Sequence, residues 1–224
     1  MAEEKIIALI PAHNEHEHIT TVVTAARQYL PVLVVDDGST DDTALLAEAA
    51  GAQVLRQTPN QGKGAAMIAG FKLALSQGAG AVITLDGDGQ HDPDEIPAFL
   101  TSYARQPVGM IIGQRDYSQM PRFRRTTNTV GRAMISLALG QYIPDNQSGY
   151  RLISRSLLER LVDSPEKGFE LEVDMITLCL KYKLGLGWVP IRTIYAGQAS
   201  HIRPMRHLVH YIRIVLKAWR TMHS

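Results

Sequence analysis

The sequence predicts an α/β protein with a mostly parallel central sheet flanked by helices. Short apolar runs alternate with helical segments over about the first half of the chain, and most runs end at Pro, Gly or Asp. This alternation is typical of right-handed βαβ units, whose strands lie parallel. The 224 residues, 45% of them hydrophobic, are enough for one sizeable core.

Five strands are expected in this first half: Lys5–Ile10, Val32–Asp37, Ala52–Gln57, Ala81–Asp86 and Val108–Arg115. Parallel strands bring their carboxyl ends to one edge of the sheet, where such sheets bind ligands. Four segments that follow or end strands are therefore expected to meet at that edge: Pro11–Glu15, Asp36–Asp37, Asp86–Asp88 and Gly113–Arg115.

Helices are expected between these strands and through the second half: Glu15–Tyr29, Ser39–Gly51, Ala65–Gln77, Pro93–Arg105, Phe123–Leu139, Arg155–Val162 and Glu170–Tyr182. One more strand is expected near Gly187. No internal repeat, low-complexity tract or linker divides the chain. We therefore expect a single domain over residues 1–204, followed by a basic amphipathic helix over residues 205–224.

The composition excludes several classes of protein. One cysteine, Cys179, cannot form an internal disulfide; it fits a reducing compartment and a position in the core. The N-terminus lacks a signal-peptide pattern, and no apolar run reaches the roughly 18 residues of a membrane-spanning helix. A cytoplasmic location is expected.

The net charge of +1 hides an uneven distribution. Residues 1–180 carry 15 Lys and Arg against 22 Asp and Glu, whereas residues 181–224 carry 8 basic residues and no acid. No nucleic-acid-binding module accompanies these basic residues, so no nucleic-acid partner is expected.

The strongest candidate site is Asp86-Gly87-Asp88 at the end of a strand. Side chains two apart on a strand end point the same way, and two such carboxylates suit Mg²⁺ or Mn²⁺ that also binds a phosphate. The alternative is an Asp-Gly turn with Asp92 capping the next helix. A calcium-binding hand loop fits poorly, because His91 and Pro97 stand where its glycine and bidentate acid belong.

Asp36 and Asp37 form a second acid pair at the end of another strand. Acids gathered at one edge raise each other's pKa unless a cation neutralises them. Their alternative role is to accept hydrogen bonds from neutral donors such as ribose hydroxyls or a base N–H. In the plainer interpretation, Ser39 or Asp41 only caps the next helix.

Two further segments carry candidate ligands. Lys63 opens a glycine-rich helix start, where it is placed to reach a phosphate, although the spacing is not that of a P-loop. The alternative is a flexible helix start. His13, His16 and His18 lie close together in the sequence, but their spacing matches no common zinc pattern and favours solvated histidines.

Eight segments, in this order, together resemble family 2 glycosyltransferases, most of all the dolichol- or polyprenyl-phosphate mannosyltransferase branch. They are Pro11–Glu15, Val35–Ser39, Asn60–Gly64, Asp86–His91, Gly113–Arg115, Gln147–Arg151, Phe169–Glu170 and Ser200–Pro204. Each motif is weak alone, but the ordered series spans nearly the whole chain.

The resemblance implies a nucleotide-sugar-binding sandwich of the GT-A type and an inverting sugar transfer. It implies that the nucleotide sugar is bound by Pro11, His13, Glu15, Asp37, Lys63, Asp86 and Gln90. It also implies that Mg²⁺ or Mn²⁺ is held by Asp86, Asp88 and Gln90. His13 stands where the family more often has Tyr, which leaves the identity of the nucleobase open.

The acceptor determines which other residues are needed. A lipid phosphate is already anionic and requires only cations to hold it, for which the candidates are Arg115, Arg124, Arg125, Arg132 and Arg203. A hydroxyl acceptor requires a base, and Asp145 lies where related hydroxyl-transferring enzymes keep one. The expected catalytic residues are Asp88, Arg115, Asp145 and Arg203.

The C-terminal segment predicts a helix with two stripes. The apolar stripe is Met205, Leu208, Ile212, Val215, Trp219 and Met222, and the basic stripe is Arg206, His210, Arg213, Lys217 and Arg220. Such a helix suits peripheral contact with the cytoplasmic face of a membrane that contains anionic lipid. The alternative is packing on the core, on a second copy or on a membrane partner subunit.

The sequence therefore favours transfer of mannose or a glucose-like sugar from a nucleoside diphosphate, as in GDP-mannose or a UDP-sugar, to a polyprenyl or dolichyl phosphate. Two alternatives stay open: a glycosyltransferase that acts on a glycan hydroxyl, and a non-catalytic nucleotide-sugar-binding protein.

Overall fold

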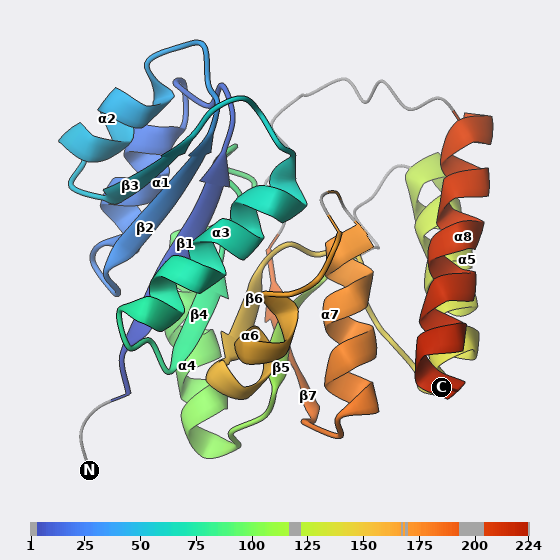
Figure 1. The fold of residues 1–224 in the computed structure, drawn as a ribbon. Coiled ribbons are helices and arrows are strands. Elements are labelled where there is room, and N and C mark those ends of the chain that lie inside the picture. Colours follow the sequence, from blue (N-terminus) through green and yellow to red (C-terminus); the bar gives the residue numbers. More distant parts are fainter. Residues whose placement is uncertain (1–3, 117–121, 167, 169, 193–203, 224) are drawn as a thin grey trace.

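The computed structural model describes residues 4–116, 122–166, 168, 170–192 and 204–223, with only the backbone of residues 122–127 and 204–210 (Figure 1). Its strands are β1 (Ile6–Ala12), β2 (Val32–Asp37), β3 (Gln53–Gln57), β4 (Ala81–Thr84), β5 (Met110–Arg115), β6 (Arg151–Ser154) and β7 (Leu186–Ile191). They form one sheet in the order β3-β2-β1-β4-β6-β5-β7, which confirms the predicted α/β class.

The sheet is parallel except at β6, which runs antiparallel to both β4 and β5. This strand was not predicted. Because β6 runs the opposite way, it begins at the edge where the other strands end. The loop that precedes it, residues 145–150, therefore reaches the edge at which ligands were expected.

The helices are α1 (Ile19–Ala26), α2 (Thr43–Ala49), α3 (Lys63–Ser76), the 3-10 helix η1 (Pro93–Glu95), α4 (Ile96–Arg105), α5 (Arg122–Leu139), α6 (Arg155–Leu161), α7 (Glu170–Lys181) and α8 (Pro204–His223). Both α1 and α2 begin later than expected, because hydrogen bonds tie the two preceding loops together. Asn14 Oδ1 accepts from Thr40 N at 2.8 Å, and Glu15 N donates to Thr43 Oγ1 at 2.8 Å.

Helices cover both faces of the sheet (Figure 1). Two apolar layers hold them there. Alternation along β2 divides the strand between them: Leu33 and Val35 face one layer, and Val32 and Val34 the other. The first layer contains buried side chains of α3, α6 and α7, and the second contains those of α1 and α4. The sheet is thus buried on both faces, as parallel sheets are.

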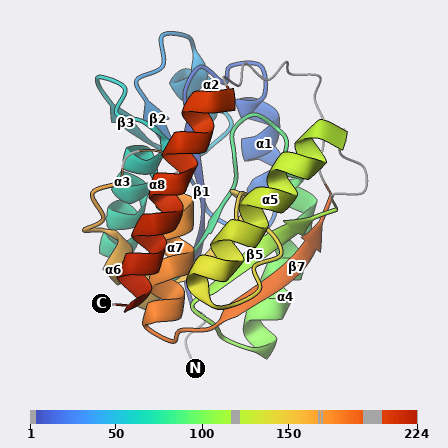
Figure 2. The same ribbon diagram turned by 90° about the vertical axis from the view of Figure 1, so that its right-hand side faces the viewer.

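Helix α8 lies beside α5 and α7 (Figures 1 and 2) and has two apolar faces rather than one. Five side chains lie against the core or within it: Tyr211, Ile214, Val215, Ala218 and Met222. Ile212, Leu216 and Trp219 remain exposed. The predicted single stripe was therefore wrong within the described side chains, because Val215 and Met222 face inward while Ile212 and Trp219 face outward.

Candidate active site

Asp37 anchors the loop that leads into α3. Its two carboxylate oxygens accept from the backbone N–H groups of Gln61 and Gly62, each at 2.8 Å, and the residue is 3% exposed. The next residue, Gly38, has φ +73°, and a Cβ there would lie 2.7 Å from the backbone nitrogen of Asn60. The loop can approach β2 this closely only because residue 38 is glycine.

A charged cluster around Lys63 joins the start of α3, the segment after β4 and α7. Lys63, the first residue of α3, places its Nζ 2.7 Å from Asp86 Oδ1 and 3.1 Å from Glu172 Oε1 of α7. Burial by itself raises the pKa of Asp86, but the Lys63 ammonium and its hydrogen bond, together with His91 and Arg115, lower that pKa to about 2. Burial likewise lowers the pKa of Lys63, but Asp86 and Glu172 together raise it well above its usual range.

Asp88 lies at the turn that follows, where its carboxylate bonds to Gln90. Its Oδ1 accepts from Gln90 N at 3.0 Å, and its Oδ2 from Gln90 Nε2 at 2.8 Å. Glu15 approaches from β1: burial and then the Asp88 carboxylate raise the pKa of Glu15. Negative charge is therefore concentrated where β1 and β4 end.

This arrangement fits a divalent cation that shares its ligands with a diphosphate. Among the described residues, no three His, Cys, Asp or Glu side chains form a complete metal site. Asp86 and Asp88 would supply two oxygens, and Mg²⁺ and Mn²⁺ commonly take the rest from phosphate and water.

The buried side chain of His91 holds this turn in place. The residue is 7% exposed, and its Nδ1 accepts from Asp86 N at 3.0 Å, so the neutral ring carries its proton on Nε2. Burial lowers the pKa of His91. The ring contacts Tyr150, which in turn stacks on Phe99 of α4. The segment is thus anchored, and Asp92 caps η1 through Asp94 N, which confirms that part of the plainer interpretation.

Asp145 and Arg115 form a bidentate pair beside the β5 end. Arg115 Nε donates to Asp145 Oδ2 at 2.7 Å, and Nη2 donates to Oδ1 at 2.9 Å. Asp145 is fully buried and also accepts from the backbone nitrogens of Arg115, Gln147 and Ser148. Its lone pairs are directed at N–H donors, which is an arrangement for orienting a guanidinium group and shaping a loop.

The loop ahead of β6 packs on the charged cluster. Gly149 O accepts from Thr84 Oγ1 at 2.7 Å. A Cβ at Gly149 would lie 3.0 and 3.1 Å from the two oxygens of Asp86 and 3.2 Å from Lys63 Nζ. Arg151, 0% exposed, donates to the backbone carbonyls of Asn146, Ser148 and Glu172. This buried guanidinium joins the loop to α7.

Several predicted candidates lie elsewhere or outside the described side chains. The side chains of Arg124 and Arg125, and all of Arg203, lie outside the described part of the chain. Arg132 on α5 lies over the ring of Tyr142, 5.7 Å from its centroid. Two of the three histidines bond to other groups: His13 Nδ1 lies 3.1 Å from the backbone carbonyl oxygen of Asp37, and His16 Nδ1 lies 2.8 Å from the carboxylate oxygen Oδ2 of Asp41.

The structure adds residues to which the sequence analysis gave no role. Glu172 lies in the first turn of α7, where acids are common on electrostatic grounds, so nothing in the sequence separates it from a solvated acid. His91, Gly149 and Arg151 were part of recognised motifs, but their anchoring role depends on contacts across the chain. The N-cap of α2 is Asp42, which makes no side-chain cap bond, whereas Asp41, one residue earlier, accepts from Thr43 N through its Oδ1 at 3.0 Å; Asp41 therefore fixes the start of the helix without being its N-cap.

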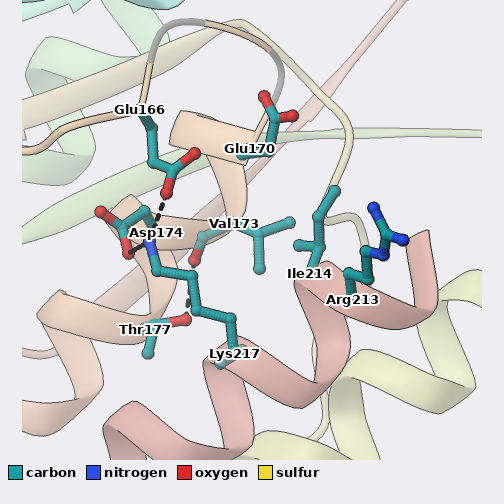
Figure 3. A pocket seen from close by; sticks show the side chains of 9 residues that line it. Glu166, Glu170, Val173, Asp174, Thr177, Arg213, Ile214 and Lys217 are labelled. Atoms are coloured by element: carbon teal, nitrogen blue, oxygen red, sulfur yellow. Dashed lines mark hydrogen bonds and ion pairs between the residues drawn. The ribbon is translucent and has the colours of Figure 1, made fainter. Parts of the chain in front are cut away.

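A cavity of about 250 Å³ lies between α7 and α8 (Figure 3). Lys217 of α8 reaches across one side of it to Glu166 and Asp174, at 2.6 and 3.4 Å. None of the residues that line this cavity lies in the four strand-end segments of the candidate active site, but Glu170 belongs to the Phe169–Glu170 motif and Val173 follows Glu172 on α7.

Comparisons with known proteins agree with the geometry. The model of the family described as glycosyl transferase family 2 matches residues 7–162. UDP-N-acetylglucosamine–dolichyl-phosphate N-acetylglucosaminyltransferase from Methanococcus voltae is 31% identical over 87% of this chain and 88% of its own length. Polyprenol monophosphomannose synthase from Mycolicibacterium smegmatis is 30% identical over 84% and 77%.

A solved structure shares the fold. Glucosyl-3-phosphoglycerate synthase from Mycobacterium tuberculosis, crystallised with Mn²⁺ and UDP-glucose, superposes with a TM-score of 0.73 and 22% identity, covering 99% of this chain and 79% of that one. The fold is therefore that of the GT-A glycosyltransferases.

Proposed function

The chain belongs to glycosyl transferase family 2, and we propose that it transfers a sugar from a nucleoside diphosphate to a polyprenyl phosphate with inversion at the anomeric carbon. Membership makes it an enzyme, which removes the non-catalytic alternative. Relatives named for transfer to dolichyl or polyprenyl phosphates cover most of both chains, which supports the lipid phosphate as acceptor.

The observation that carries the proposal is the saturation of Asp145. A general base needs a lone pair directed at the acceptor's proton. Asp145 is instead fully buried against Arg115 and backbone N–H groups. An acceptor that needs no base fits this site, and a phosphate monoester, whose second pKa is about 6, is already anionic near neutral pH.

The proposed reaction is one displacement. A phosphate oxygen of the lipid forms a bond to the anomeric carbon while the bond between that carbon and the donor's diphosphate oxygen breaks. Arg115, oriented by Asp145, holds the acceptor phosphate, and we propose the same role for Arg132 and for Arg124, Arg125 and Arg203. No proton has to be removed.

The donor binds where β1, β2 and β4 end. Pro11, His13 and Glu15 line the nucleotide side, and Asp37 supports it through the loop at residues 60–62. Asp86, Asp88 and Gln90 would hold Mg²⁺ or Mn²⁺, which when bound neutralises the charge that develops on the leaving diphosphate. Lys63, already within the Asp86 cluster, adds a positive charge on the same side.

The test is a transfer assay with matched acceptors. The enzyme is incubated with Mn²⁺ and labelled UDP-N-acetylglucosamine, UDP-glucose or GDP-mannose, and with a short polyprenyl phosphate or the corresponding polyprenol. Label is expected in the phosphate lipid alone. Transfer to the polyprenol, abolished by Asp145→Asn, would establish the hydroxyl acceptor instead.

We also propose that α5 and α8 place the enzyme on a membrane surface that contains anionic lipid. Residues 117–144 and 175–224 contain no Asp or Glu, and they include both helices. Exposed apolar side chains occur on each: Val130 and Leu137 on α5, and Ile212, Leu216 and Trp219 on α8. The two helices lie side by side on one face of the molecule (Figure 2). In the described ranges, no helix is both long and apolar enough to cross a bilayer.

Vesicle flotation tests this orientation. The protein should float with vesicles that contain anionic lipid and not with neutral ones, and high salt should weaken binding. Leu216→Ser combined with Trp219→Ala should reduce binding several-fold. Equal flotation of this double variant and the wild type would reject α8 as a contact.

A further inference from the structure

We infer that Glu172 is a positioning residue for donor binding: it holds the ammonium group of Lys63 between two carboxylates and so fixes Asp86 in the orientation that the donor complex needs. The inference rests on the proposed function. It assigns a role to a residue that none of the predicted motifs contains, on a helix 109 positions from Lys63.

The contacts define the direction of this effect. The Glu172 side chain is 8% exposed, and its Oε1 lies 3.1 Å from Lys63 Nζ. The same Nζ lies 2.7 Å from Asp86 Oδ1. Lys63 is a long side chain with many rotamers, so contacts to two carboxylates restrict it more than a contact to Asp86 alone would.

The sharing of Lys63 also preserves negative charge on Asp86. One ammonium group serves two carboxylates, so the cluster of three side chains keeps a net charge of −1. Without the Glu172 charge, Lys63 would neutralise Asp86 alone, and the attraction of this edge for a divalent cation would decrease.

The surrounding structure prevents the cluster from adjusting freely. Gly149 packs closely against both Asp86 and Lys63. A Cβ atom at residue 149 would lie only 3.0 to 3.2 Å from their charged atoms. The backbone of Glu172 is itself held, because the buried Arg151 donates to its carbonyl oxygen. Glu172 is thus a fixed point from which Lys63, and through it Asp86, is positioned.

The opposite side of α7 supplies a matched control. Asp174 is also a partly buried acid paired with a lysine, since its side chain is 12% exposed and it pairs with Lys217 of α8 (Figure 3). This pair lies toward α8 and does not contact Lys63 or Asp86. Asp174→Asn therefore removes a comparable charge from the same helix without touching the donor side.

The experiment measures binding of UDP and GDP in the presence of Mn²⁺ by calorimetry, with thermal unfolding of each ligand-free variant as a second measurement. Glu172→Gln is expected to weaken nucleotide binding about tenfold or more, while Asp174→Asn leaves it unchanged. Glu172→Asp keeps the charge but shortens the side chain, so a positioning role predicts that this variant loses affinity as well.

A double-variant cycle tests whether Glu172 acts through Lys63. In the Lys63→Met background, adding Glu172→Gln should change nucleotide affinity by no more than about twofold, because the group that Glu172 positions is absent. Additive losses, or wild-type affinity in Glu172→Gln or Glu172→Asp, would overturn the inference and leave the proposed function intact. Failure of the wild type to bind either nucleotide would overturn both.

Discussion

Two pairs of aspartates lie at the same edge of the sheet and differ in the hydrogen-bond donors that surround their carboxylates. Asp37 and Asp145 are buried, and each carboxylate is surrounded by N–H donors of the backbone or of Arg115. Asp86 and Asp88 are only partly buried and contact side chains that a ligand can displace or join. A strand-end acid is therefore a structural anchor or a ligand according to its donors, whatever motif contains it.

The difference has an energetic basis. A hydrogen bond to a charged group contributes about 1.5–3 kcal/mol, so the saturated aspartates stabilise the loops around the site. The less saturated aspartates keep acceptor capacity for a cation and a diphosphate. Substitutions at Asp88, Arg115 and Asp37 test this division between anchoring and ligand-binding aspartates, and one at His91 tests the turn that carries Asp86 and Asp88.

The largest expected effect is that of Asp88→Asn. Removing this charge should lower the turnover number about 10²-fold or more, because charge on the leaving diphosphate is no longer offset. The melting temperature should change little, since the amide can still accept from Gln90 N. Steady-state rates with saturating donor and thermal unfolding check both expectations. Turnover within threefold of the wild type would mean that Asp88 is a structural anchor and not a ligand.

Arg115→Lys should have the next largest effect. Lysine keeps the charge but cannot form the bidentate pair with Asp145, so kcat/KM for the lipid phosphate should fall about 10- to 100-fold. Nucleotide affinity should be unchanged. Arg155→Lys is the control, because that arginine forms an exposed ion pair with Glu159. Equal losses in acceptor and nucleotide binding would contradict a role confined to the acceptor.

Asp37→Asn should act mainly on stability. The amide group offers one acceptor oxygen where the carboxylate offers two, so one of the two backbone N–H groups loses its bond to residue 37 and the free energy of unfolding should fall by about 1–3 kcal/mol. Asp42→Asn is the control, because Asp42 is exposed and makes no capping bond. Urea denaturation compares the two. Unchanged stability together with lost nucleotide binding would make Asp37 a direct ligand.

The smallest effect concerns pH and His91. Since burial lowers the pKa of His91 in the folded state, the unfolded chain binds a proton below about pH 6.5 that the folded chain does not. The free energy of unfolding should therefore fall with decreasing pH, with this group contributing at most about 1.4 kcal/mol per pH unit. In His91→Asn that contribution is absent. Identical slopes between pH 5 and 7.5 would show that His91 titrates normally.

Much of the fold follows from the sequence because most strands are apolar runs followed by Pro, Gly or Asp. The exception, β6, has four residues, begins with a charged arginine and continues directly into α6. Nothing local identifies such a strand. Its place depends on pairing with β4 and β5, which are far away in the chain.

The candidate site, like the fold, was predictable only in part. Asp86 and Asp88 were recognisable because acids directly follow an apolar run. The saturation of Asp145 by Arg115, 30 residues away, was not recognisable, and neither was the contact of Glu172 with Lys63. A sequence pattern shows which groups reach an edge, but donors from distant segments decide what those groups do.

A crystal structure with Mn²⁺ and a nucleoside diphosphate would show whether the strand-end aspartates divide into ligands and anchors, since anomalous scattering locates the manganese. We expect one Mn²⁺ ligated by Asp88 and the diphosphate, with Asp86 adjacent and Asp145 still paired with Arg115. Manganese between α7 and α8, or a diphosphate bound away from the ends of β1 and β4, would contradict this expectation.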